Sequence, residues 1–476
     1  MSDNINEIIF ENDPEASALL DKYRMATVPR DKFAAGIRLF DLADIKGYKE
    51  QSSMLLDRME KEAYTEEQRN IILIKRGENL LRQSRFEEAT VHLEKAVVGL
   101  SQHPESLDLF QAYRNLAWIY FRQGYLERAR SFTDGAGLVL EMRTGKNDHE
   151  TLSARAALYH ILGLIESSSG EQDSAIGYYD REIGLLEELG ENSRIGSVYN
   201  NLSGIYKTKG MYARALDFQL KSFRMAENSG ELLSLAISCN NLGEIYHALG
   251  KYPEARDFYG RYLEINQKIN NTVGNAFGYA GLGRIHQSEG EYSQSEGYFN
   301  KALDIAGQVK SKGKEASILA EMTELYLAWD QTDKAVKCLD RAIKISLEIE
   351  RLNTHRHQVL NAKIFMKRGL AGELDRETLI KARDILADVL SRTITIEDEE
   401  AVSAIELEIE AWSSLATIEY QLGCKEKAAE NIVRAEEKID FIAGQLEPDL
   451  KESFLRRIDI RWVHERKALI ENMEQG

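Results

Sequence analysis

The 476-residue sequence has little cysteine and little proline. The three cysteines, Cys239, Cys338 and Cys424, are too few and too scattered for a disulfide framework or a cysteine-based zinc site. A sandwich or barrel of many short strands needs many turns, and five prolines are few for such a fold. The chain is therefore expected to be mostly helical and to lie in a reducing compartment.

Positive charge is also in short supply. The 61 Lys and Arg residues face 78 Asp and Glu residues, which gives a formal net charge of −17. A surface with this balance repels phosphate backbones, which disfavours nucleic acid as a partner. No run approaches the roughly 18 apolar residues of a spanning helix, and the N-terminal residues lack the pattern of a secretion signal. We expect a cytoplasmic protein without membrane insertion.

What the sequence does contain is a repeat of 40 residues. The segment Tyr199–Leu216 (YNNLSGIYKTKGMYARAL) aligns with Cys239–Arg256 (CNNLGEIYHALGKYPEAR). A small residue anchors each unit, and steps of 40 residues, with one of 46 between the second and third anchors, reach Gly77, Ala117, Gly163, Ser203, Gly243, Gly283 and Thr323. A register held for this long predicts a repeat architecture.

Each unit predicts two helices joined by a tight turn. In the unit anchored on Gly243, Tyr246 follows three positions later and shares a helical face with the anchor. Gly250, seven positions after the anchor, would end the first helix in the left-handed conformation. Ala255, twelve positions after the anchor, would let the second helix approach the first closely. Because one hairpin cannot bury its apolar face alone, the hairpins are expected to stack.

This pattern resembles the tetratricopeptide repeat. The segment Asn241–Ala255 (NLGEIYHALGKYPEA) has the family's leucine, small residue, tyrosine, glycine, tyrosine and alanine in order. The 40-residue units look most like the extended repeats of Pins-type scaffolds and kinesin light chain, and similar repeats occur in bacterial signalling regulators. The resemblance implies an all-α, right-handed α-solenoid, a superhelix of stacked antiparallel helix hairpins with helical caps.

The period divides the chain into three predicted parts. Residues 1–64 lie outside it and are expected to form an N-terminal helical cap, with an effector or partner-binding module as the alternative; Phe33, Ile37 and Phe40 mark an apolar stripe there. Residues 65–349 form the regular array of about seven units. Residues 350–476 are expected to hold irregular repeat-like units and a capping helix.

Two features organise the predicted C-terminal part. A loosened unit has Gly369 in place to close its first helix and Ala382 in its second, and a clearer unit is anchored on Ala416 and closed by Gly423. A charged helix follows the break at Pro448, and its expected apolar face is Phe454, Leu455, Ile458 and Trp462.

Catalytic patterns are missing from the sequence. It has no phosphate-binding G-x-x-x-x-G-K-[ST] motif, no H-E-x-x-H motif and no G-x-S-x-G elbow. His355 and His357 are two residues apart, which is the wrong spacing for a shared metal on one helical face. We predict a protein that is not an enzyme, has no metal site and uses no cofactor.

The family resemblance places the first helix of each hairpin on the concave side, where it implies that asparagines hold the backbone of a partner peptide. Two positions before the anchor the sequence has asparagine in three units, and an amide can both donate and accept a hydrogen bond. The candidate peptide-binding residues are Asn115, Asn201 and Asn241, their neighbours Asn200 and Asn240, and the basic or imidazole side chains Arg114, Lys207, His247 and Arg284.

Three functional hypotheses remain open. The first is a non-catalytic scaffold that binds a partner peptide or helix of another protein in the concave groove. The second is a bacterial signalling regulator whose superhelix binds a peptide or small ligand and controls a kinase, a response regulator or a transcription factor. The third is self-association through the C-terminal region.

Overall fold

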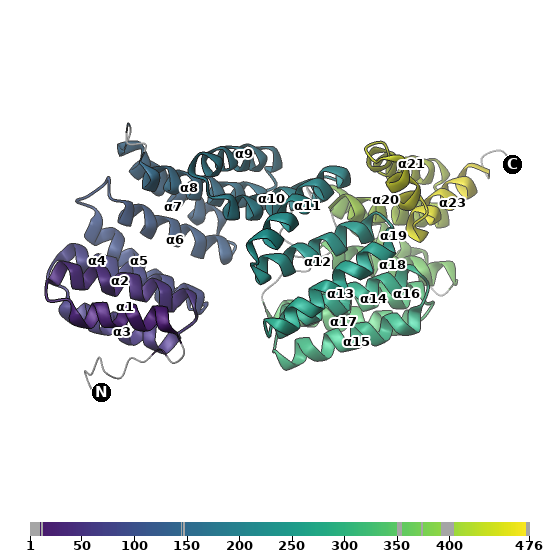
Figure 1. Cartoon of the computed structure of the whole chain (residues 1–476). Helices are drawn as coiled ribbons and strands as arrows, with labels where there is room; N and C mark the ends of the chain where they lie inside the picture. Colours follow the sequence, from purple (N-terminus) through teal and green to yellow (C-terminus); the bar gives the residue numbers. More distant parts are fainter. Residues whose placement is uncertain are drawn as a thin grey trace. The chain divides into compact units, whose positions relative to one another are not determined.

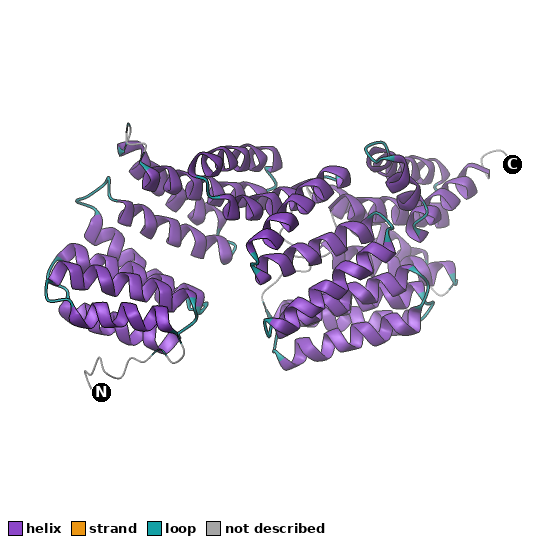
Figure 2. Ribbon diagram, viewed as in Figure 1, coloured by secondary structure: helices purple, strands orange, loops and turns teal. Residues whose placement is uncertain are grey.

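The computed structural model describes residue 10 and residues 13–143, 145, 148–349, 355–372, 375–391 and 404–472. These residues form 23 α-helices and no β-strand, which confirms the predicted all-α class. Figure 2 shows helices joined by loops throughout the described residues. None of the described helices combines the length and the apolar character needed to cross a membrane.

The contacts divide the chain into two compact units, residues 1–190 and residues 191–476. The helices of unit 1 are α1 (Pro14–Met25), α2 (Pro29–Ile45), α3 (Lys49–Glu62), α4 (Glu66–Arg82), α5 (Phe86–Leu100), α6 (Leu107–Arg122), α7 (Leu126–Met142), α8 (His149–Ser168) and α9 (Gln172–Leu189). The predicted division at residues 64 and 349 stays a prediction.

Unit 2 holds the other fourteen helices of the described chain, which Figure 1 colours from teal to yellow. They are α10 (Asn192–Thr208), α11 (Tyr212–Ser229), α12 (Leu232–Ala248), α13 (Tyr252–Lys268), α14 (Thr272–Ser288), α15 (Tyr292–Gln308), α16 (Lys312–Ala328), α17 (Thr332–Glu348), α18 (His355–Leu370), α19 (Arg376–Ser391), α20 (Ala404–Gln421), α21 (Lys425–Ala443), α22 (Pro448–Leu455) and α23 (Ile458–Asn472).

The helices pair into hairpins, from α4 with α5 to α20 with α21, and within each unit every hairpin packs on the next. Within unit 2 the first helices of successive hairpins also contact one another, in the order α10, α12, α14, α16, α18 and α20. The second helices of the described hairpins form no comparable layer. A stack of this kind curves toward the helices that touch. We call these six helices the first-helix layer of unit 2.

The turn inside each hairpin is left-handed, as the glycine spacing predicts. Gly124, Gly170, Gly210, Gly250, Gly290 and Gly423 all have φ between 71° and 84°. The two units without glycine at this position use the same conformation, because Ser84 has φ 58° and Asp330 has φ 57°. The turn is therefore a property of the repeat, and its glycine removes a steric cost that Ser84 and Asp330 bear.

The predicted close approach of the two helices is confirmed by hydrogen bonds. The hydroxyl of Ser203, an anchor, donates to the carbonyl of Ala215 over 2.7 Å. In the next but one hairpin the roles are exchanged, since the hydroxyl of Ser295 donates to the carbonyl of the anchor Gly283 over 2.8 Å. A hydroxyl can reach the partner backbone only where both side chains at the contact are small.

Ring pairs repeat at the same distance along the chain. In four units the ring three positions after the anchor stacks on a ring of the second helix. Tyr206 stacks on Phe218 and Tyr246 on Phe258, with centroids 5.4 and 5.5 Å apart and interplanar angles of 1° and 9°. Such pairs stabilise a fold beyond their area burial. The aromatic residue at this position thus stabilises the packing of the two helices of one hairpin.

The N-terminal segment contains three helices, α1–α3. They have a core of their own, in which Phe40 is fully buried while Phe33 and Ile37 are partly buried. Polar contacts join this core to α4: the amide of Asn79 donates to Asp44 over 2.7 Å. The period could not predict α1, because its residues share no spacing with the repeats.

The C-terminal part departs from the sequence-based expectation at two points. Helix α18 continues through Gly369, against which Leu379 packs, and the left-handed residue that follows the helix is Gly372, with φ 73°. Ala382 is buried in α19 as predicted. The expected single charged helix is broken into α22 and α23, so Phe454 is fully buried while Ile458 is 49% exposed. Placing Ile458 on the apolar face was therefore wrong.

A candidate binding face on the first helices

The candidate residues fall into two groups that the fold does not place together in one unit. Arg114 and Asn115 belong to α6 in unit 1. The other seven belong to three consecutive first helices of unit 2: Asn200, Asn201 and Lys207 on α10, Asn240, Asn241 and His247 on α12, and Arg284 on α14. Figure 1 places α12 and α14 among the teal helices of unit 2.

An amide pair connects α10 and α12. The side-chain amide of Asn241 donates a hydrogen bond to the side-chain oxygen of Asn200 over 2.7 Å. Asn240 donates to the side-chain oxygen of Asn241 over 3.3 Å and to the carboxylate of Glu244 over 3.1 Å. The period of 40 residues places the asparagine pairs of successive hairpins next to each other, so that Asn200, Asn240 and Asn241 form one connected group across two hairpins.

Asn201 differs from these neighbours. It is partly exposed, and its side chain makes no hydrogen bond to any residue that the structure describes. Its amide keeps one acceptor and two donors for a ligand. Asn241, at the equivalent position of the next unit, is already engaged by Asn200 and Asn240.

The asparagine series ends at α14 for a steric reason. Gly281 occupies the position equivalent to Asn201 and Asn241. A Cβ atom on Gly281 would lie 2.5 Å from the ring of Tyr259, which is fully buried beneath the first helices. The hydroxyl of Tyr259 accepts a hydrogen bond from Arg284 over 2.9 Å. The glycine therefore makes room for a tyrosine that holds an arginine of the binding face.

The basic residues of the face are balanced by carboxylates of the following hairpins. Lys207 lies 2.6 Å from Glu244, and Arg284 lies 3.2 Å from Glu321. Burial alone would raise the pKa of Glu244, but the charges of Lys207 and Arg284 outweigh it and hold that pKa below its usual value. Lys207 and Arg284 thus support a charge-balanced chain along the layer and not a uniformly positive strip.

The chain of ion pairs continues through the rest of the layer. Arg356 on α18 lies 3.2 Å from Glu324 on α16, and Lys363 on α18 lies 3.5 Å from Glu410 on α20. Burial raises the pKa of Glu410, although Lys363 opposes this shift. Each contact joins one first helix to the next, so the polar face itself helps to fix the spacing of the layer.

His247 is held in its neutral form. Its Nε2 atom lies 3.0 Å from the hydroxyl of Ser288 on α14. Burial lowers the pKa of His247 to about 3, and the nearby charges of Arg284 and Arg457 act in the same direction. The imidazole therefore offers hydrogen bonding and no positive charge at neutral pH.

In unit 1 the equivalent asparagine is engaged in the same manner as Asn241. Asn115 is buried, and its amide donates to Glu78 on α4 over 3.3 Å. The side chain of Arg114 donates to the oxygen of Asn115 over 3.3 Å. The same carboxylate of Glu78 accepts a hydrogen bond from Gln111 over 2.7 Å. Asn115 therefore contributes to contact between hairpins.

Sequence reasoning missed an apolar part of this face. Leu233, Ile237 and Val273 are 54%, 44% and 42% exposed. Leu233 and Ile237 lie on the same helical stripe as Asn240 and Glu244, at spacings of four, three and four residues. Val273 is the repeat equivalent of Leu233. Only the offset from the anchor could have revealed this set, since exposed aliphatic residues are common.

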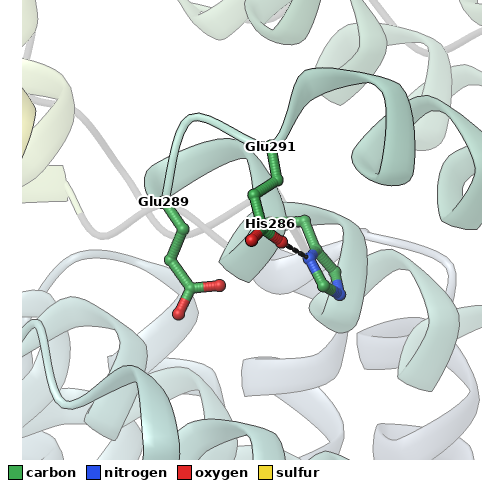
Figure 3. Close-up of side chains that lie close together, drawn as sticks. All are labelled: His286, Glu289 and Glu291. Carbon is green, nitrogen blue, oxygen red and sulfur yellow. Dashed lines mark hydrogen bonds and ion pairs between the residues drawn. The ribbon is translucent and has the colours of Figure 1, made fainter.

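One group of the described residues has the composition of a metal site. His286, Glu289 and Glu291 offer ligand atoms within 4.8 Å of one another. Figure 3 shows that the imidazole and Glu291 already contact each other, with Nδ1 of His286 2.6 Å from the carboxylate. Arg256 pairs with Glu289 over 2.5 Å, and His286 stacks on Tyr298. These contacts account for the three side chains within the fold, and they do not point to a metal.

Family comparison identifies the repeated hairpins. A family model of the tetratricopeptide repeat matches residues 194–268 and 275–348, and a second one matches residues 111–133. The matched segments are tetratricopeptide repeats. The resemblance predicted from the sequence is thereby confirmed, and the longer match covers the helices that carry Asn201, Asn241 and Arg284. A search of curated proteins gives no significant match.

Solved structures share the fold at low identity. A Rap protein complexed with competence and sporulation factor is 18% identical, with a TM-score of 0.54 over 80% of this chain and 100% of that chain. Aspartyl phosphate phosphatase F from Bacillus subtilis is 13% identical, with a TM-score of 0.51 over 79% and 95%. NprR in complex with its cognate peptide NprX is 14% identical, with a TM-score of 0.52 over 77% and 98%. These similarities show a common helical-repeat fold.

Proposed function

We propose that this protein is a non-catalytic signalling regulator that binds an extended peptide of another protein on the first-helix layer of unit 2. The observation that carries the proposal is the amide of Asn201, which is partly exposed, is not engaged by any described residue and lies on the same helix as Asn200 of the amide pair. We place the bound peptide backbone along Asn201, Asn200 and Asn241.

The chemistry of the face suits a peptide in extended conformation. An extended backbone presents N–H and C=O groups that have no internal partners, and an amide side chain can satisfy one of each. Asn200 and Asn241 hold each other in a fixed orientation, so little side-chain entropy remains to be lost on binding. Affinity from hydrogen bonds of this kind is independent of the peptide's own sequence.

The flanks of the amide group would select the sequence. Leu233, Ile237 and Val273 lie toward the N-terminal ends of α12 and α14 and are exposed, whereas Glu244 and Arg284 lie toward the C-terminal ends. Successive side chains of an extended peptide point to opposite sides. We therefore expect a ligand with apolar side chains on one edge and polar or charged side chains on the other.

Proteins of the same fold lend the proposal support. The Rap structure holds competence and sporulation factor, and the NprR structure holds a cognate peptide. The proposal assigns this chain no reaction, cofactor, metal or nucleic-acid partner, and a position in the cytoplasm. Self-association through the C-terminal part and a capping role for residues 1–64 remain proposals that sedimentation of truncated chains can test.

The proposal can be tested by selecting ligands from a displayed library of random linear peptides on the full chain. A selected peptide is then titrated calorimetrically against Asn201→Ala. We expect the affinity to fall about five- to tenfold, the loss of one or two hydrogen bonds. The matched control is Asn300→Ala, which changes an exposed asparagine on the second helix α15. Equal affinities of the two variants would refute the site.

A further inference from the structure

The end of unit 2 contacts its beginning. The guanidinium of Arg457, between α22 and α23, donates to the carbonyl of Ala248 at the end of α12 over 2.5 Å. The same guanidinium binds Glu406 at the start of α20 and Asp459 at the start of α23, each over 2.6 Å. One side chain thus joins the second hairpin of the unit to its final helices.

Contacts on either side of Arg457 extend this junction. Lys251, in the turn between α12 and α13, pairs with Asp449 on α22. A Cβ atom on Gly250 of the same turn would lie 2.5 Å from the backbone oxygen of Ser453. One hairpin earlier, a Cβ atom on Gly210 would lie 2.7 Å from Ile405, at the start of α20. The turns after α10 and α12 are therefore both covered by the C-terminal helices.

The junction is built around a buried charge. The side chain of Arg457 is only 11% exposed, and two carboxylates from different helices compensate it. Burial alone would lower the pKa of Arg457, but Asp459 and Glu406 outweigh this and raise it well above its usual value. Removing one partner of such a group leaves a charge without compensation in a poorly solvated place. The contact is therefore specific and sensitive to substitution.

We propose that Arg457 is a positioning residue for the peptide site, because it closes unit 2 and thereby fixes the spacing of α10 and α12. These two helices carry Asn200, Asn201 and Asn241, and the turns that follow them are the ones covered at the junction. We call the contact of α22 and Arg457 with the turn after α12 the closure of unit 2, and this closure rests on the contacts described above alone. Its effect on ligand binding rests on the proposed function.

Thermodynamic linkage makes the coupling between closure and peptide binding reciprocal. If closure favours the spacing that the peptide requires, the peptide in turn stabilises closure by the same factor. A ligand that binds α10 and α12 would then slow the release of α22 and α23 from the turn, although it contacts neither helix. No change of the Arg457 contacts themselves is needed for this coupling.

Two glycines offer a matched pair of variants. Gly250 and Gly290 occupy the same turn position in successive hairpins, with φ of 71° and 79°. Alanine is strained at both for the same backbone reason. Only at Gly250 does the added Cβ meet the C-terminal helices, because nothing lies within 4 Å at Gly290. The difference between Gly250→Ala and Gly290→Ala therefore measures the effect of the contact with the C-terminal helices. Arg457→Gln and Arg457→Lys test the contribution of the guanidinium group.

Hydrogen exchange of the full chain without ligand measures closure. We expect Gly250→Ala and Arg457→Gln to raise exchange in α22 and in the turn after α12 about tenfold, which corresponds to the loss of a charge-assisted hydrogen bond. Gly290→Ala should leave α22 unchanged, and Arg457→Lys should lie between. Unchanged exchange in both Gly250→Ala and Arg457→Gln would overturn the closure.

Calorimetry with a peptide selected on the unaltered chain measures the positioning role. We expect weaker binding by Gly250→Ala and Arg457→Gln, unchanged binding by Gly290→Ala and partial recovery in Arg457→Lys. Faster exchange with unchanged affinity would overturn the positioning role and leave the proposed function intact. Failure to select any peptide would overturn the proposed function and the positioning role together, while the exchange result would still decide the closure.

Discussion

Asn241 on α12 donates a hydrogen bond from its side-chain amide to the side-chain oxygen of Asn200 on α10, over 2.7 Å and across 41 residues of sequence. The pair links two hairpins at the centre of the proposed binding face. It has two consequences that can be separated by experiment: a contribution to the packing of the hairpins, and an orientation of Asn241 toward a ligand.

Replacing Asn200 separates these contributions. Asn200→Ala removes the acceptor of Asn241, so the free energy of unfolding should fall by about 1 kcal/mol and peptide affinity should fall with it. Asn200→Asp keeps an acceptor and should preserve most of both. Urea denaturation and calorimetry measure the two quantities. A loss of stability without any loss of affinity would mean that the pair serves packing alone.

The apolar flank gives a second prediction. Ile237→Asp places a charge where we expect an apolar side chain of the peptide, so the affinity for a selected peptide should fall about tenfold or more. Leu347→Asp is the control, because Leu347 is 62% exposed on the second helix α17. Calorimetry should find the control unchanged. Equal effects of the two variants would exclude Ile237 from the site.

The packing beneath the face gives a third prediction. Gly281→Ala should destabilise unit 2, because the new Cβ atom would meet the fully buried ring of Tyr259 at 2.5 Å. Gly297→Ala, in the interior of α15 with open space around it, should stabilise by about 0.5–1 kcal/mol. Thermal unfolding of both variants measures the difference. Two stabilising changes would contradict the role assigned to Tyr259.

The imidazole of His247 gives a prediction about pH. Its folded-state pKa of about 3 lies below the ordinary value of 6.5, so the unfolded chain binds the proton more readily. Its contribution to stability is therefore complete above pH 6.5 and is lost as pH falls toward 3, with a slope of at most about 1.4 kcal/mol per pH unit. Arg284, Arg457 and Asp459 are the charged groups around it and stay ionised over most of this range.

Urea denaturation at several pH values between 6.5 and 4 measures this slope. His247→Gln cannot take up the proton, so its stability should depend less on pH than that of the unaltered chain. His357, whose pKa burial lowers to about 4, contributes a similar slope that remains in the variant. Identical pH dependence of the two proteins would show that His247 is already accessible to protons in the folded state.

The sequence predicted the parts of the fold that depend on local spacing. The glycine at Gly250 predicted a left-handed turn, and the small residues at Ser203 and Ala215 predicted a close helix contact, because both follow from positions within one hairpin. The same logic failed where the register loosens. Gly369 has the right offset to end α18, yet the helix continues to Leu370, Leu379 packs against Gly369, and the left-handed residue is Gly372.

The sequence could predict the candidate site only as a set of positions counted from the anchor of each repeat. Spacing places Asn201 and Asn241 at equivalent positions, but whether an amide is engaged depends on the neighbouring hairpin. Asn241 meets Asn200, whereas the side chain of Asn201 meets no described hydrogen-bond partner. The balance of Lys207 by Glu244 likewise joins residues from different units. Such contacts require the helix spacing, which no single repeat encodes.

The junction at Arg457 changes how unit 2 should come apart. A linear stack of repeats has two loose ends, and its hairpins can fray one after another because each depends only on its immediate neighbours. When Ala248 and Arg457, 209 positions apart, are held together, fraying from the C-terminal end also exposes the second hairpin. Unit 2 should therefore unfold as a single cooperative unit. Its refolding should be slow, because the contact between Ala248 and Arg457 joins residues that are far apart in the sequence.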